Sequence, residues 1–259
     1  MGFKQDRIAY QTIVVAELKR ILRIWSQTLL PPAITSILYF IIFGRVIGTR
    51  VGFMGGYKYV QFIAPGLIMM NIITSSYASA VSAFFGAKFQ RHIEEILVSP
   101  ASNITILLGF MSSGLLRGII VGIIVSIIAL FFTHLHIHSL ITIILTALLA
   151  SSIFSLAGLI NAIYAKSFDD ISIIPTFVLT PLTHLGGVFY SINLLPLVWQ
   201  HVSYLNPISY IVNNFRYGFF GIVGGGSRLI LSYFLMLAFV VILFGITYLL
   251  MKKWVGLRD

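Results

Sequence analysis

The chain has 259 residues, of which 58% are hydrophobic and only 9% are charged, and its formal net charge is +10 at pH 7. Globular domains carry about 25% charged residues, so this composition excludes a soluble globular protein and indicates an integral membrane protein. The absence of cysteine excludes a disulfide framework, a thiolate metal site and a cysteine nucleophile. The positive-inside rule accounts for the excess of Lys and Arg, so we expect no binding to nucleic acid.

The first predicted element is an amphipathic helix ahead of the first apolar run. On a helical wheel its apolar residues share one arc and its charged residues the other: Val14, Val15, Leu18, Ile21, Leu22 and Trp25 against Glu17, Lys19, Arg20 and Arg23. This pattern predicts a helix within residues 1–24 that lies in the membrane interface, apolar face toward the lipid. The alternative is a simple cytoplasmic extension of the first span.

Two long apolar runs come next. About 20 apolar residues of helix cross a hydrocarbon core of about 30 Å, and both runs reach that length. The first, 25–45, contains Pro31 and Pro32, which predict a kink or a late helical start. A glycine-rich polar loop, 48–57, separates it from the second run, 59–86, which is long enough to tilt or to extend past the lipid.

A short amphipathic helix is predicted directly after the second span. Its apolar residues recur at helical spacing with charged residues between them: Phe89, Ile93, Ile96, Leu97 and Pro100 against Lys88, Arg91, Glu94 and Glu95. The pattern predicts a helix held against the membrane with its charges in an aqueous phase. The alternative is a solvated turn.

The third apolar run is interrupted by Arg117. A charge at the bilayer centre is costly, so this residue either lines a polar path or marks the start of the span. We favour a position near one membrane face, because residues 117–132 alone cover about 24 Å at 1.5 Å per residue. The polar break 133–139 ends the run, and a fourth span is predicted over 140–164.

The last third of the chain contains more prolines than one helix accommodates. After the polar turn 166–170, the charge-free stretch 171–215 includes Pro175, Pro181, Pro196 and Pro207. We expect a span at about 172–190, broken helices that enter the membrane and return, and a final span over 229–251. With six spans and the N-terminus inside, most Lys and Arg residues lie in cytoplasmic segments. A seventh crossing would lower the number of these cytoplasmic residues by only one.

The sequence contains no nucleotide-binding loop of the G-x-x-x-x-G-K-[ST] type. We therefore expect no ATP hydrolysis by this chain, no catalytic residues and no cofactor of its own. Asp169 and Asp170 are adjacent, so their side chains diverge, which favours a helix N-terminus or a partner contact over a catalytic dyad.

Several histidines are candidates for chemistry. His134, His136 and His138 alternate along an extended segment as metal ligands do, but histidines at a membrane face need no metal, so no metal site is predicted. His184 and Asn161 lie inside apolar runs, where such groups either serve a proton relay or make one hydrogen bond between packed helices.

One set of spaced residues carries a family resemblance. It consists of Leu179-x-x-Leu182-x-x-Leu185-Gly186-x-Val188, then Leu195-Pro196, then Pro207-Ile208-x-Tyr210 and Arg216. The set resembles the signature of the membrane-spanning permeases of type-2 ATP-binding-cassette (ABC) exporters. Segments 84–91 and 168–172 are also similar to those of a bacterial inner-membrane permease in that family, and the similarity covers nearly the whole chain.

The resemblance implies a specific architecture. The chain would be an all-α integral membrane protein forming one domain over residues 1–259, with an interfacial helix (1–24), a six-span bundle (25–251) and a cytoplasmic tail (252–259). The coupling helix over 88–97 would contact the ATPase through Lys88, Arg91, Glu94 and Glu95. Re-entrant helices between spans five and six would carry Leu195, Pro196, Pro207, Tyr210 and Arg216. Both termini would be cytoplasmic, in a bacterial inner membrane.

The resemblance also implies partners. The permease would work as a pair with two separate ABC ATPase subunits, which would bind ATP and Mg²⁺, and would form the export path for a substrate that the sequence does not specify. The main alternative is an ion-coupled secondary transporter that uses His184 or Arg117 as its intramembrane charge. That class shows broken helices in both halves, whereas the prolines here concentrate in the second. A membrane-embedded enzyme would need convergent acids, and acidic residues are few.

Overall fold

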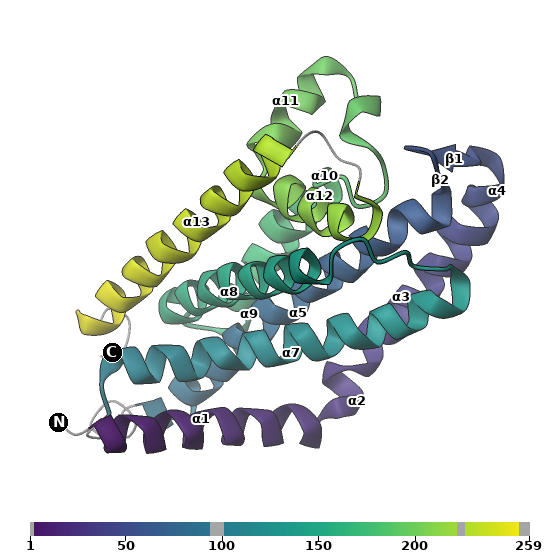
Figure 1. The fold of residues 1–259 in the computed structure, drawn as a ribbon. Helices are drawn as coiled ribbons and strands as arrows, with labels where there is room; N and C mark the ends of the chain where they lie inside the picture. Colours follow the sequence, from purple (N-terminus) through teal and green to yellow (C-terminus); the bar gives the residue numbers. More distant parts are fainter. Residues whose placement is uncertain (1–2, 94–100, 222–225, 254–259) are drawn as a thin grey trace.

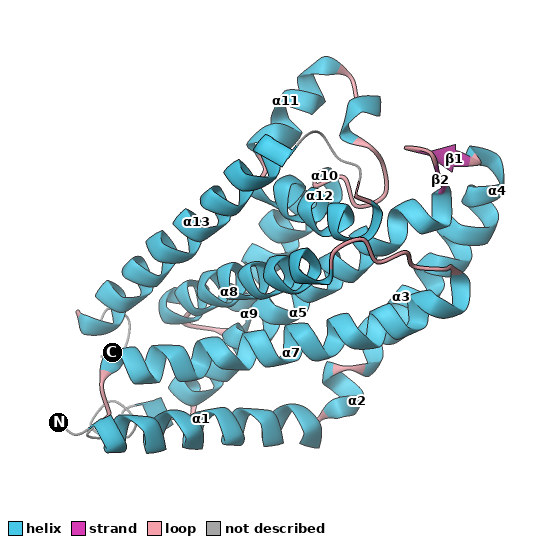
Figure 2. Cartoon of the chain, in the orientation of Figure 1, coloured by secondary structure: helices cyan, strands magenta, loops and turns pink. Residues whose placement is uncertain are grey.

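The computed structural model describes residues 3–93, 101–221 and 226–253. The described chain is a bundle of long helices with one small β-hairpin, and α1 (Phe3–Arg23) begins at the same end of the bundle where α13 (Gly226–Lys252) finishes (Figure 1). Figure 2 shows how little of the described chain is loop. The prediction of an all-α membrane protein is confirmed at this level.

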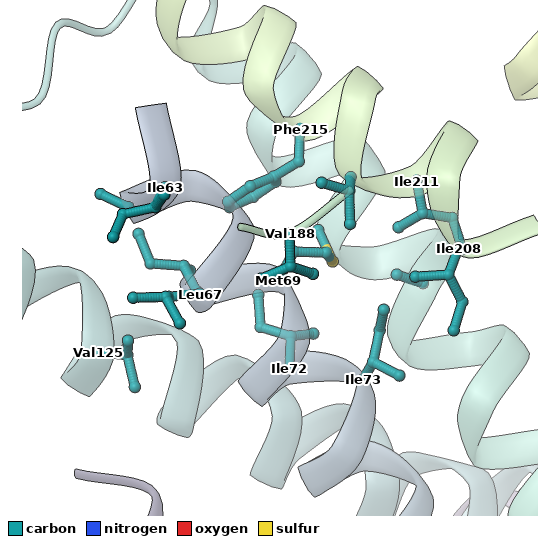
Figure 3. Packing of buried hydrophobic residues seen from close by; sticks show 14 of the residues in the cluster. Ile63, Leu67, Met69, Ile72, Ile73, Val125, Val188, Ile208, Ile211 and Phe215 are labelled. Carbon is teal, nitrogen blue, oxygen red and sulfur yellow. The ribbon is translucent and has the colours of Figure 1, made fainter. Parts of the chain in front are cut away.

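The central helix of the bundle is α5 (Tyr59–Phe89), which packs against α7 (Asn103–Phe132), α8 (Leu140–Tyr164) and α12 (Pro207–Phe220). Its apolar side chains interdigitate with those of the neighbouring helices and of the loop that carries Val188 (Figure 3). Glycines on α7 allow close approach, because a Cβ at Gly118 would meet the Ser76 hydroxyl and, at 3.3 Å, the Ile72 carbonyl. The bundle is therefore built around α5.

Five helices among the described residues are long and apolar enough to cross a membrane: Trp25–Val51, Tyr59–Phe89, Asn103–Phe132, Leu140–Tyr164 and Leu229–Lys252. These agree with the predicted first, second, fourth and last spans. Another helical run, made of α9 (Phe168–Ile174), a π-helical turn (Pro175–Leu179) and α10 (Thr180–Leu185), falls outside this set. The number of six spans stays a prediction.

The first span has the predicted late start. Its regular part, α3 (Leu30–Tyr39), begins with Pro31 and Pro32 in the first turn, after the short helix α2 (Trp25–Thr28). A π-helical segment (Phe40–Ile47) and α4 (Gly48–Val51) extend it. The predicted polar loop is partly ordered as strands β1 (Phe53–Met54) and β2 (Tyr57–Lys58), which pair across Gly55 and Gly56.

The position of Arg117 near one membrane face stays a prediction, but the helix that carries this residue does not begin there. Helix α7 runs without a break from Asn103 to Phe132, so Arg117 lies near its middle, and its guanidinium Nη2 donates to the backbone carbonyl of Thr28 at 3.1 Å. The carbonyl is available because Pro32, four residues on, has no backbone N–H to offer it. One guanidinium nitrogen thus has an acceptor inside the protein, whereas the buried Nε has no hydrogen-bond partner among the described residues.

The second half of the chain folds back onto the bundle. After α10, a 3₁₀ turn (Ile192–Leu194) and α11 (Leu197–Leu205) form the tip of the molecule, and α12 then runs back between α5 and α8 (Figure 1). Helix α13 packs mainly on α8, where the Tyr233 hydroxyl lies 2.9 Å from Thr146 Oγ1. Most of its surface is exposed, including Ile230 and Phe234.

Candidate functional site

Arg216 is the polar centre of the signature region. Its side chain is only 3% exposed, and its guanidinium contacts polar and aromatic groups. Its Nη2 donates to the Gly187 carbonyl at 2.8 Å and its Nε to the Phe62 carbonyl at 3.3 Å, and the guanidinium lies 3.9 Å from the Phe62 ring centroid. One cation thus ties α12 to α5 and to the loop that follows α10.

The Gly186–Val188 part of the signature is explained by close backbone packing. Gly187 has φ +75°, a conformation that favours glycine, and a Cβ on Gly186 would meet Ile208 at 2.7 Å. On the facing helix, a Cβ at Gly66 would lie 2.5 Å from the Val188 carbonyl oxygen. Three glycines therefore allow the loop to lie directly on α5 and α12. Sequence reasoning missed Gly66, whose only signal is a small residue in an apolar run.

The remaining signature residues set the ends of the short helices. Pro196 is the N-cap of α11, and the Leu195 carbonyl accepts a hydrogen bond from Gln200. Pro207 occupies the first turn of α12 after the N-cap Asn206, whose Nδ2 donates to the Leu182 carbonyl at 2.6 Å. Tyr210 is half-buried on the same helix. Leu195 and Pro196 thus lie at the tip, while Pro207, Tyr210 and Arg216 share α12.

The opposite end of the bundle holds the predicted coupling segment. Lys88 belongs to the last turn of α5, and its Nζ donates to the carbonyls of Ile163 and Ala165 at the end of α8. Arg91 is exposed and has φ +60°, the left-handed conformation that commonly ends a helix. Ile93 is 2% exposed in the apolar cluster at this end. Glu94 and Glu95 lie outside the described residues, so their predicted role stays a prediction.

Helix α1 meets this end of the bundle through Asp6. Its Oδ1 accepts hydrogen bonds from the Ser102 backbone N–H at 2.9 Å and from the Thr105 hydroxyl at 3.0 Å, in the first turn of α7. These donors, the Ser102 amide first, lower the pKa of Asp6 below its usual value. A carboxylate at a helix N-terminus is also favoured by the helix dipole.

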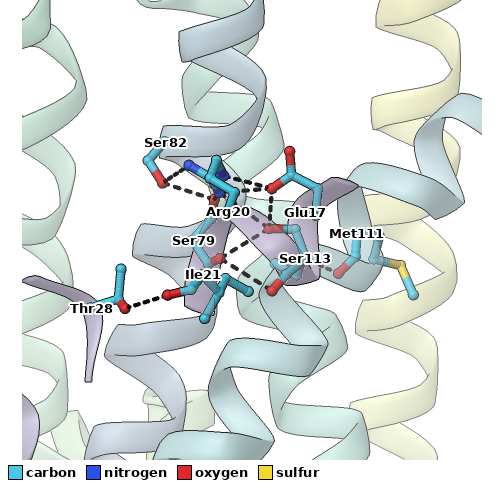
Figure 4. Close-up of polar contacts among 9 residues, drawn as sticks. Glu17, Arg20, Ile21, Thr28, Ser79, Ser82, Met111 and Ser113 are labelled. Carbon is cyan, nitrogen blue, oxygen red and sulfur yellow. Dashed lines mark hydrogen bonds and ion pairs between the residues drawn. The ribbon is translucent and has the colours of Figure 1, made fainter. Parts of the chain in front are cut away.

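A second contact of α1 was not expected from the helical wheel. Glu17 and Arg20, predicted on the solvent arc, form an ion pair at 2.8 Å that points into the bundle. The Glu17 carboxylate accepts from the Ser113 hydroxyl at 2.9 Å, and Arg20 donates to the Ser79 carbonyl and the Ser82 hydroxyl (Figure 4). Val15, Leu22 and Trp25 of the predicted apolar arc are exposed. The helix is therefore bonded to α5 and α7 through its polar side.

The other polar candidates have local roles. Ser167 and Asp170 form a capping box at the start of α9, as expected for a helix N-terminus, and the amides of Lys166 and Ser167 lower the pKa of Asp170. The Asn161 side chain donates to the Ile171 carbonyl, and the His184 ring packs edge-on against Phe189. Within the described residues no three His, Asp or Glu side chains come together in a metal-binding group.

The sequence of this chain is similar to those of known proteins. The model of the ABC-2 type transporter family matches residues 8–220, which extend from α1 to the end of α12. The chain is 52% identical over 252 residues to the inner membrane transport permease YadH of Escherichia coli strain K12, covering 97% of this chain and 98% of that protein. The chain belongs to the ABC-2 type transporter family. The resemblance drawn from the signature is confirmed.

More distant relatives of this ABC-2 type transporter chain carry another name. It is 25% identical over 181 residues to nodulation protein J of Rhizobium leguminosarum bv. trifolii, covering 70% of this chain and 69% of that protein. Identity to nodulation protein J of Rhizobium meliloti strain 1021 is 23% over the same length. Together with the long apolar helices, family membership makes the chain the transmembrane permease component of an ABC transporter.

Proposed function

We propose that this chain is the permease subunit of an ATP-driven exporter in a bacterial inner membrane, paired with a second copy and driven by two separate ABC ATPase subunits. The family match over residues 8–220 carries the proposal. The name of the Escherichia coli relative, an inner membrane transport permease, supports the location. The absence of a nucleotide-binding loop from the sequence supports an ATPase on another chain, which would bind the ATP and Mg²⁺.

The proposal includes six spans with both termini cytoplasmic. The helical run Phe168–Leu185 would be the fifth span, because its length corresponds to about 27 Å at 1.5 Å per residue and apolar side chains such as Phe177 and Val178 are exposed along it. The segment 88–97 would then face the cytoplasm, and 195–216 would form a re-entrant element on the outer side. Residues 1–259 would act as one domain.

Co-purification with the ATPase tests this function. The tagged permease and the ATPase encoded beside it are co-expressed, and each is used to recover the other from solubilised membranes. Glu94→Lys with Glu95→Lys should weaken recovery while the permease stays folded in the membrane, because the reversed charges would oppose the cationic or polar partner groups. Asp259→Lys makes the same kind of charge change in the C-terminal tail and should leave recovery intact.

A proton-gradient assay separates this proposal from the ion-coupled alternative. Permease reconstituted without ATPase should show no transport-linked proton uptake when a pH gradient is imposed. Transport by the permease alone would establish a secondary transporter and overturn the proposal. Family membership favours the ATP-driven class, and His184, the candidate proton carrier, packs against an aromatic ring.

A further inference from the structure

Two charged side chains connect α5 and α7, the described helices on either side of residues 94–100, to two other helices. At the entry, Lys88 Nζ reaches the Ile163 carbonyl at 2.9 Å and the Ala165 carbonyl at 2.8 Å, at the end of α8. At the exit, Asp6 of α1 accepts from Ser102 and Thr105 at the start of α7. Each contact joins one helix flanking the segment to a helix that does not flank it.

The entry contact fills a gap in the hydrogen bonding of α8. In a continuing helix the Ile163 carbonyl would accept the amide of Ser167, but that amide donates to Asp170 Oδ2 at 3.0 Å instead. The Lys88 ammonium supplies the missing donor. Its positive charge also lies at the C-terminal end of a helix, where the dipole favours cations.

The exit contact has the opposite polarity. The first amides of α7 have no intrahelical acceptor, and Ser102 Oγ satisfies only the amide of Thr105, at 3.2 Å. The Asp6 carboxylate takes the Ser102 amide and places a negative charge at the positive end of α7. A cation at the end of α8 and an anion at the start of α7 are therefore both in their favourable positions.

We propose that Lys88 and Asp6 are positioning residues which pass a displacement of the 88–101 region to α8 and α1. This inference rests on the ATPase-coupled permease proposed above. When the ATPase moves the region, α5 and α7 move because they are continuous with it. Helix α8 already packs along α5, and α1 is bonded to α5 and α7 through Glu17 and Arg20. Lys88 and Asp6 add the contacts that hold the ends of α8 and α1 in register with this movement, so four helices shift as one body.

Spin labels can follow this movement, because the chain has no native cysteine. In a permease pair, one introduced cysteine reports the distance between the two copies. Gln90 lies at the end of α5 and Tyr164 at the end of α8, and both are exposed. In the complex with ATPase, ATP should change the distance between the copies at both positions. Lys88→Met should reduce the change at Tyr164 and keep it at Gln90.

Matched variants separate positioning from general stabilisation. Lys88→Arg keeps donors for the α8 carbonyls and should restore the response at Tyr164. Lys166→Met removes an exposed lysine near the same helix end and should leave the response as in the native chain. A Lys88→Met variant that responds at Tyr164 as fully as the native chain would overturn the inference. If that variant does not accumulate, Lys88→Leu, which also lacks a donor, takes its place with the same readout.

The exit contact is tested independently. Labels at Gln5 on α1 and at Ile104 on α7 should both respond to ATP in the native chain, and Asp6→Ala should reduce the response at Gln5 alone. Asp169→Ala, an exposed acid of α9, is the control. Equal responses at Gln5 and Ile104 in Asp6→Ala would refute this half. If the native complex shows no ATP response even at Gln90, the proposed function itself fails, which is a different result.

Discussion

Arg117 donates a hydrogen bond to the backbone carbonyl of Thr28, the carbonyl that Pro32 leaves without its helical partner. Helix α7 therefore supplies, through Arg117, the hydrogen-bond donor that Pro32 lacks at the start of the first span. The contact joins the middle of one candidate span to the base of another, and it gives the arginine a structural reason to lie inside the bundle.

Pro32→Ala should make Arg117 less important. The alanine supplies an amide that can reach the Thr28 carbonyl, so Arg117→Met should cost about 1 kcal/mol less in the Pro32→Ala background than in the native chain. The free energy of unfolding, measured for all four proteins in the same lipid nanodiscs, gives the coupling. An identical cost in both backgrounds would show that the hydrogen bond contributes nothing measurable.

Arg216→Lys should destabilise the protein by about 2 kcal/mol, because lysine cannot match the planar fork that contacts two carbonyls and a ring. Thermal unfolding of the purified permease measures the loss. Arg50→Lys, at an exposed position on α4, is the matched control and should leave the unfolding temperature unchanged. Equal behaviour of the two variants would contradict the central role of Arg216.

Gly66→Ala and Gly86→Ala lie on the same helix and should have opposite effects. At Gly66 the new methyl group would meet the Val188 carbonyl oxygen at 2.5 Å, so the loop must move and stability should fall. At Gly86 the new Cβ would meet no atom of another described segment within 4 Å, so alanine should raise stability by about 0.5–1 kcal/mol through its better helix propensity. Melting temperatures of both variants test this prediction. If Gly66→Ala left the melting temperature unchanged, the loop that carries Val188 would be able to move away from the new methyl group at little cost.

Acid should release the contact between Asp6 and α7. Because the folded-state pKa of Asp6 is lowered, its contribution is fully present above the unfolded pKa of about 4 and is lost as the pH falls through the folded value. Between pH 6 and pH 3 the native chain should thus lose more stability than Asp6→Asn, which cannot titrate. Unfolding temperatures across that range test the difference, and parallel curves would exclude the contribution.

Sequence periodicity predicted the long helices because apolar runs of 20 or more residues leave few alternatives in a bilayer. Tyr59–Phe89 and Leu140–Tyr164 were found within a few residues of their observed ends. Four of the signature residues, Pro207, Ile208, Tyr210 and Arg216, share α12. The prolines correctly indicated breaks at α3 and between α11 and α12.

The contacts between distant residues could not be read from the sequence. The partner of Arg117 could not be predicted, because its acceptor is the backbone carbonyl of Thr28, 89 residues away in the sequence. Glu17 and Arg20 were assigned to water because a helical wheel does not show that Ser79 and Ser113 face them from two other helices. In each case a polar group is accommodated by a partner that only the tertiary fold supplies.

Helix α13, like the first candidate span Trp25–Val51, depends on its surroundings more than the central helices do. In its most apolar window only 11% of residues are buried in the protein, against 78% for α5. Its side chains therefore take most of their solvation from lipid tails. A thinner or thicker bilayer can retilt this helix without repacking its neighbours, so the composition of the host membrane becomes a control on the shape of the permease.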